Sequence, residues 1–222
     1  MQHNFSCIPA TLTAISKTIS HPRLGRYLPA AKGDIQYALR LYMWNARLCQ
    51  EFYIPTQLTE IAFRNALAQG LEKRFGENWY TAAGIVSGLP LRMQNELKRA
   101  KTSEFKNHGT NMTSGHIVSA MSLGFWVHLV SANPRQYIWK GNVRPLFPHL
   151  PAHIRDADIH TKIDKLRKFR NRIAHHNAVF DRKPVKQYQN IQDIISWICP
   201  ETFWLMKQSA NPAYVLSLRP RT

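Results

Sequence analysis

The residues best suited to chemistry lie between Leu166 and Phe180, in the segment LRKFRNRIAHHNAVF. Within it, Asn171 and His175 are four residues apart, so on a helix they stack on one face, one turn apart. Arg170 directly precedes Asn171, and its long side chain can reach the same patch. The sequence therefore predicts that a guanidinium, an amide and an imidazole converge beside the C-terminus of a helix.

These three groups suit the chemistry of a phosphodiester. A guanidinium offers a fixed fork of donors to two phosphate oxygens and keeps its charge near neutral pH. An imidazole titrates near neutrality and can give or take a proton in a transition state. The neighbouring amide can orient either group. No cage of carboxylates accompanies them, so the segment implies no metal ion and no other cofactor.

The same residues also have a purely structural interpretation. Basic side chains in the last turn of a helix interact favourably with the negative end of the helix dipole. Short motifs of this kind also arise by chance. From spacing alone, Arg170 and His175 are therefore either catalytic groups or surface charges at a helix end.

The composition is that of a globular chain with a strong excess of positive charge. The 222 residues include 30 Lys and Arg against 13 Asp and Glu, which gives a formal net charge of +17. Such an excess favours a polyanionic partner, RNA or another nucleic acid before a membrane surface. No stretch reaches the roughly 20 apolar residues that a membrane span needs, so we expect no membrane association.

The cysteines, histidines and N-terminus all favour a cytoplasmic protein without a metal site. Cys7, Cys49 and Cys199 are isolated from one another, which predicts reduced thiols. The N-terminus lacks the basic start and apolar run of a signal peptide. The histidines are scattered, and the adjacent His175 and His176 point about 100° apart on a helix.

Helical periodicity dominates the segments between turn-forming residues, which predicts an all-α fold. The motif helix is expected from about residue 157, because five apolar side chains form one stripe along it: Ile159, Ile163, Leu166, Phe169 and Ile173. A short helix or turn is expected at residues 8–18. Other helices are expected at residues 35–53, 56–75, 89–103, 113–130, 185–198 and 200–208, with a further short one within 131–156.

The breaks between these elements suggest an N-terminal extension (1–33), a helical domain (34–208) and a basic tail (209–222). Residues 21–34 are expected to be a loop, and the tail is expected to be loosely ordered. Pro55 is predicted to kink or end the first long helix. Gly124 is expected at a close helix crossing, because glycine in a helix costs about 1 kcal/mol relative to alanine. Trp126 sits in an apolar run and is expected in the core.

The string RNRIAHH, followed by Val179 and Phe180, resembles the Abi-like (abortive-infection) branch of the HEPN ribonuclease superfamily. Arg170, Asn171 and His175 stand at the arginine, polar and histidine positions of the HEPN motif. The segments TEIAFRNAL (59–67), SLGFW (122–126) and YIWKGNVRPLFPHLP (137–151) resemble further parts of the family. The likeness covers about residues 35–207 and implies a HEPN-like helical bundle with additional helices.

This resemblance implies a metal-independent endoribonuclease that acts as an abortive-infection or toxin effector, with a cognate antitoxin as a further partner. The RNA 2′-hydroxyl would attack the adjacent phosphorus and leave a 2′,3′-cyclic phosphate. His175 would be the general acid or base, with His176 as a second candidate. Arg170 would stabilise the phosphorane, and Asn171 would orient the histidine or bind the phosphate. Because each chain has one such set, a homodimer is expected.

One departure from the family pattern favours an alternative function. Relatives usually carry Glu-Pro after the double histidine, whereas this chain carries Asn177 and Ala178. The alternative is a non-catalytic RNA-binding or scaffold protein of the same family. A DNA-binding regulator ranks last, because the sequence contains no helix-turn-helix pair. Glu60 and Arg64 form either a simple helix ion pair or a polar cluster that supports the site from behind.

Overall fold

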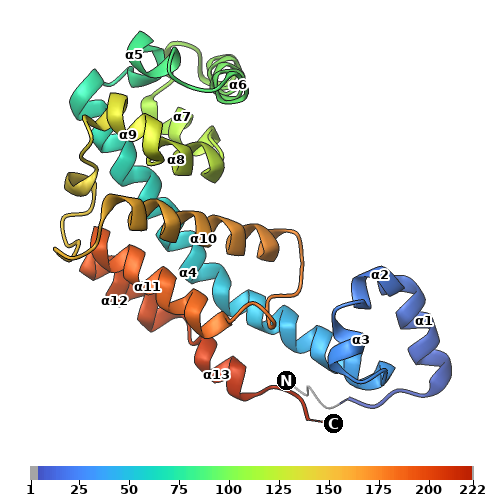
Figure 1. Ribbon diagram of the computed structural model, residues 1–222. Coiled ribbons are helices and arrows are strands. Elements are labelled where there is room, and N and C mark those ends of the chain that lie inside the picture. Colours follow the sequence, from blue (N-terminus) through green and yellow to red (C-terminus); the bar gives the residue numbers. More distant parts are fainter. Residues whose placement is uncertain (1–4, 222) are drawn as a thin grey trace.

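The computed structural model describes residues 5–221, and every regular element within that range is a helix (Figure 1). Residues 1–4 of the expected extension and residue 222 of the expected tail lie outside it. The fold is built on α4 (Ile35–Phe75), a helix of 41 residues. The Asp34 side chain caps it by accepting from the Tyr37 amide at 3.0 Å. The predicted all-α class is confirmed.

α4 passes through Pro55 without a break, which corrects the prediction of two helices meeting there. Proline lacks the amide that would bond to the carbonyl four residues earlier, at a cost of about 3 kcal/mol. Here the ring is buried, and so are Phe52 on the preceding turn and Phe63 on a following one. Packing along both halves of α4 offsets that cost, since tertiary contacts override local propensity.

Two groups of helices pack on the two halves of α4, and α10 (Asp156–Ala174) lies between them (Figure 1). The group on the C-terminal half comprises α5 (Ala83–Val86), α6 (Leu91–His108), α7 (Ser114–Ala120), α8 (Leu123–Leu129) and α9 (Ala132–Trp139). The other group comprises α11 (Pro184–Ile198), α12 (Pro200–Ser209) and α13 (Pro212–Ser217). Single 3₁₀ turns occur at Trp79–Thr81, Gly109–Asn111 and Arg144–Leu146.

The N-terminal segment contains more structure than the sequence predicted. After α1 (Pro9–Ile19), the expected loop at 21–34 forms two short helices, α2 (His21–Leu24) and α3 (Tyr27–Ala30), both of which contact α4. Leu24 and Tyr27 are buried. Burial of the Leu24 side chain and the Tyr27 ring explains why the segment is ordered despite its proline and glycine content.

The segment 113–130 forms two helices rather than one. α7 and α8 are separated at Met121 and Ser122, and the Ser122 hydroxyl caps α8 by accepting from the Phe125 amide at 3.3 Å. Gly124 is therefore in the first turn of α8, where an added Cβ would approach no other helix. The predicted close crossing at Gly124 is wrong, whereas the buried position of Trp126 is confirmed.

The close approach of elements occurs instead at Gly70 of α4. A Cβ added there would lie 2.5 Å from Leu146 Cδ2 and 2.9 Å from a ring carbon of Trp139. Only glycine allows the segment after α8 to pack this tightly on α4.

The C-terminal tail is also ordered, contrary to expectation. The Trp44 indole donates to the Val215 carbonyl at 2.7 Å, and the Tyr37 hydroxyl donates to the Pro220 carbonyl at 3.0 Å. Asn211 caps α13, and Pro212 begins it. This cap-and-proline pair is a helix start that the sequence displayed. Within residues 5–221, none of the helices has both the length and the apolar character of a membrane span.

Candidate active site

α10 carries the motif and ends in a Schellman turn. Its apolar stripe is buried as predicted from Ile159 to Phe169, while Ile173 is only partly covered. His176 is left-handed, with φ of 56°, and its amide donates to the Ile173 carbonyl. The Asn177 amide donates to the Arg172 carbonyl at 2.8 Å. This pair of bonds satisfies the last carbonyls of the helix. We call residues 175–180 the motif turn.

Arg170 reaches back from α10 to the middle of α4. Its Nε donates to Glu60 Oε2 at 3.0 Å, and Arg64 Nη1 lies 4.0 Å from the other carboxylate oxygen, Oε1. The exposed fraction of the side chain is 12% for Glu60, 19% for Arg64 and 41% for Arg170. One largely buried carboxylate therefore accepts a hydrogen bond from the motif arginine and forms a longer ion pair with the arginine of its own helix.

A polar cavity of about 370 Å³ opens beside this cluster, and we call it the central cavity. Arg170 and Asn171 line it together with Glu60 and Arg64, and Arg167 and Arg92 add two further guanidinium groups. The break between α7 and α8 forms another part of its wall, and the Ser122 amide there donates to Glu96 Oε1 at 2.8 Å. The lining thus offers four guanidinium groups to a ligand and one carboxylate that neutralises part of their charge.

The structure does not bring every predicted residue into this cavity. His175 caps the end of α10 and is exposed, as is His176, and neither contributes to the lining. The two histidine side chains belong to the surface of the motif turn. Of the predicted site residues, Arg170 and Asn171 therefore line the same cavity as the supporting candidates Glu60 and Arg64. His175 lies one helical turn beyond Asn171, at the C-terminal end of α10.

Asn177 is part of a contact that the sequence did not predict. Arg23 of α2 donates from Nη1 to the carbonyls of His175 and His176, at 3.3 and 3.2 Å, and to Asn177 Oδ1 at 3.4 Å. The N-terminal segment therefore holds the motif turn directly. Positions 23 and 177 are so far apart in the chain that spacing offers no signal for this contact.

Two further residues fix the chain after the double histidine. Arg172 donates through Nε and Nη2 to the Ala178 carbonyl, at 3.1 and 2.6 Å. The buried Asn45 of α4 accepts from the amides of Val179 and Phe180, at 2.8 and 3.2 Å. These contacts leave little freedom to the turn that carries His175.

Burial and the nearby charges of Arg182 and Arg26 lower the pKa of the Arg172 guanidinium. The reference pKa of arginine is so high that the side chain remains charged at neutral pH. The same causes show that several cations are crowded around the motif turn, which raises the positive potential there.

Comparison with known proteins gives a match to a family. A family model described as Abi-like protein matches residues 17–181, well over half of the chain. The matched range begins before residue 35, where the resemblance seen in the sequence began, and it ends before α11. It includes α2, α3 and the whole motif turn. No curated protein and no solved structure matches the chain.

Proposed function

This chain belongs to the Abi-like protein family, and on that premise we propose that it is a metal-independent endoribonuclease of the HEPN superfamily, acting as an abortive-infection or toxin effector. The observation that carries the proposal is the placement of Arg170. Its side chain is fixed by Glu60 at an arginine-lined cavity and shares that cavity with Asn171. In the chain it precedes His175 by five residues.

In the proposed reaction the RNA 2′-oxygen attacks the adjacent phosphorus while His175 accepts the proton of the 2′-hydroxyl. The bond from phosphorus to the 5′-oxygen breaks, and that oxygen takes up a proton from a second acid. The products are a 2′,3′-cyclic phosphate and a 5′-hydroxyl. Arg170 offsets the negative charge that develops on the phosphorane, and its fixed position avoids reorganisation during the reaction. Asn171 binds a phosphate oxygen beside it.

The requirement for a second acid favours a homodimer, in which the partner copy supplies another His175. Apolar side chains beside the Glu60 cluster support this arrangement. Tyr53 and Ile61 on α4 are 59% and 37% exposed and line a hollow that also contains Arg170 and Ile173. A second copy seated on this face would cover them and would bring two motif turns together.

A second candidate function is RNA binding without cleavage. Two observations favour it: the His175 imidazole lies outside the cavity lining, and Asn177, in place of the family's glutamate, is engaged by Arg23. In this case the central cavity would hold a phosphate, and no proton would be transferred.

The test is cleavage of end-labelled RNA by the purified protein in EDTA, with analysis of the product ends. We expect cyclic phosphate ends. Arg170→Ala and His175→Ala should each lower the rate by about two to three orders of magnitude. His153→Ala, which removes another exposed histidine, is the matched control and should cut like the wild type. Binding without cutting would favour the second candidate, and full activity of His175→Ala would exclude its catalytic role.

Melting temperatures of the same proteins separate catalysis from helix capping. His175 is exposed, so its replacement should change stability by less than about 0.5 kcal/mol. Arg170→Ala should lower the melting temperature more than His175→Ala does, because Glu60 loses its 3.0 Å partner. If both variants unfold far below the wild type, the two residues are structural.

A further inference from the structure

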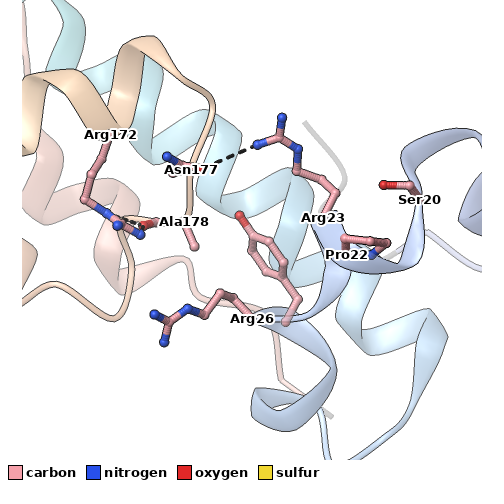
Figure 2. Close-up of a pocket in the computed structure, with 8 residues that line it drawn as sticks. Ser20, Pro22, Arg23, Arg26, Arg172, Asn177 and Ala178 are labelled. Atoms are coloured by element: carbon pink, nitrogen blue, oxygen red, sulfur yellow. Dashed lines mark hydrogen bonds between the residues drawn. The ribbon is translucent and has the colours of Figure 1, made fainter.

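A second cavity, of about 440 Å³, lies where the N-terminal segment meets the motif turn, and we call it the N-terminal pocket (Figure 2). Arg23 and Arg26 come from the N-terminal side, and Arg172, Asn177 and Ala178 come from α10 and the motif turn. The pocket is separate from the central cavity, since the two share no lining residue.

The three arginines of the N-terminal pocket are held without losing their charge. Arg172 is bonded to the Ala178 carbonyl, and Arg23 uses only Nη1 for its bonds to the turn. Within residues 5–221, Nε and Nη2 of Arg23 have no acceptor. Arg26 meets one carboxylate, Asp181, at 3.5 Å. Three cations against one partly exposed anion leave an uncompensated positive charge, and guanidinium forks match phosphate oxygens.

Tyr27 supplies an independent observation. The residue is 2% exposed and lines the pocket, and its hydroxyl has no hydrogen-bond partner within the described range. A buried hydroxyl without a partner destabilises a fold, and native proteins rarely leave one unless a ligand or water completes it. Burial raises the pKa of Tyr27 above its usual range, so the hydroxyl stays a donor. An anion is the ligand that a donor among three arginines would select.

We propose that the N-terminal pocket binds a backbone phosphate of the RNA strand, with Arg23, Arg26 and the Tyr27 hydroxyl as donors. The choice of RNA rests on the proposed function. A cavity of this size falls in the range of about 300–1,000 Å³ that holds small ligands, so it accommodates a phosphate with its sugar. Because Arg23 also holds the carbonyls of His175 and His176, a phosphate bound here fixes the position of the strand relative to the motif turn.

The experiment measures affinity for a 2′-O-methyl RNA oligonucleotide, which binds but has no 2′-hydroxyl to attack. The variants are Arg26→Gln and Tyr27→Phe. The control is Arg74→Gln, which removes an exposed arginine at the far end of α4 and so matches the loss of net charge. We expect Arg26→Gln to weaken binding about tenfold more than the control does and to lower the salt slope by about one.

Tyr27→Phe should weaken binding about tenfold and raise the melting temperature of the free protein, because it removes an unpartnered buried hydroxyl. A residue with only a packing role would not shift the two measurements in opposite directions. A Tyr27→Phe protein that binds like the wild type would overturn the inference.

The two proposals fail in different ways. If wild-type protein cuts RNA but Arg26→Gln binds like Arg74→Gln and Tyr27→Phe binds like the wild type, the pocket assignment is wrong and the nuclease stands. If the variants weaken binding but no protein cuts, the pocket assignment holds and the nuclease is wrong. Adenosine monophosphate could instead raise the melting temperature of the wild type and not of Tyr27→Phe, while the RNA affinity is unchanged in both variants. In that case the pocket binds a free nucleotide and the RNA assignment is overturned.

Discussion

The central cavity and the N-terminal pocket are both rich in arginine, but their arginines are held by different partners. In the central cavity, Arg170 and Arg64 share the carboxylate of Glu60, and Arg167 is bonded to Asp164 at 2.6 Å. In the N-terminal pocket, Arg23 and Arg172 are held by neutral backbone carbonyls, and only Arg26 meets a carboxylate, that of Asp181 at 3.5 Å. Carboxylates fix a guanidinium and cancel much of its charge, whereas carbonyls fix it and leave its charge in place.

Under the two proposals above, this difference gives the two cavities different tasks. A guanidinium that a carboxylate holds is positioned for charge that appears only during a reaction. Guanidinium groups with uncompensated charge attract a phosphate that is charged throughout. The comparison predicts that substitutions around Glu60 act mainly on stability and cleavage, while those in the N-terminal pocket act mainly on RNA affinity.

Glu60→Gln should give the largest effect, because it acts on cleavage as well as on stability. It leaves Arg170 and Arg64 without their carboxylate, and breaking a fully buried pair costs about 3–5 kcal/mol. Arg170 is 41% exposed, so we expect about 1–2 kcal/mol here. Cleavage should fall as Arg170 loses its fixed position, while RNA affinity stays close to that of the wild type. Urea denaturation and the cleavage assay measure both, with Glu201→Gln on the exposed start of α12 as control.

Unchanged stability of Glu60→Gln would break the comparison, because it would mean that the carboxylate does not hold the two arginines. A large loss of RNA affinity in Glu60→Gln would also contradict the comparison, because it would place phosphate binding at the central cavity.

Asn45→Ala should have an intermediate effect. The buried Asn45 side chain is the acceptor for the Val179 and Phe180 amides, and leaving such donors unsatisfied costs about 1–3 kcal/mol. Amide hydrogen exchange at both positions should become faster than in Asn65→Ala, which removes an exposed amide from the same helix. If exchange in the motif turn is unaffected, the turn is held by Arg172 and Arg23 alone.

His176→Gly should have the smallest effect, and it should be favourable. A residue other than glycine in the left-handed region costs about 1–2 kcal/mol, and glycine gives back part of this through its greater freedom when unfolded. We expect a gain of up to about 1 kcal/mol in the free energy of unfolding. His175→Gly, at φ of −92°, is the matched control and should lower stability. A loss in His176→Gly would show that its imidazole stabilises the turn.

The sequence by itself determined the features that depend on local repetition. The stripe from Ile159 to Phe169 predicts α10 because a helix brings every third or fourth residue to one side. Asp34 predicts the start of α4 because its carboxylate satisfies a free amide of the first turn. The motif string and the segment with Glu60 also identified the family and the residues that α10 and α4 bring together.

The tertiary structure decided everything that depends on where helices cross. Arg170 and Glu60 are 110 positions apart, and Arg23 and His175 are 152 apart, so no local period connects them. The continuation of α4 through Pro55 and the ordered tail on Trp44 are decided by packing against other elements. Local sequence fixes which face of a helix is apolar, but only the assembled fold decides which polar side chains meet. That is why Arg170 and Asn171 share a cavity with Glu60, while His175 lies on the surface of the turn.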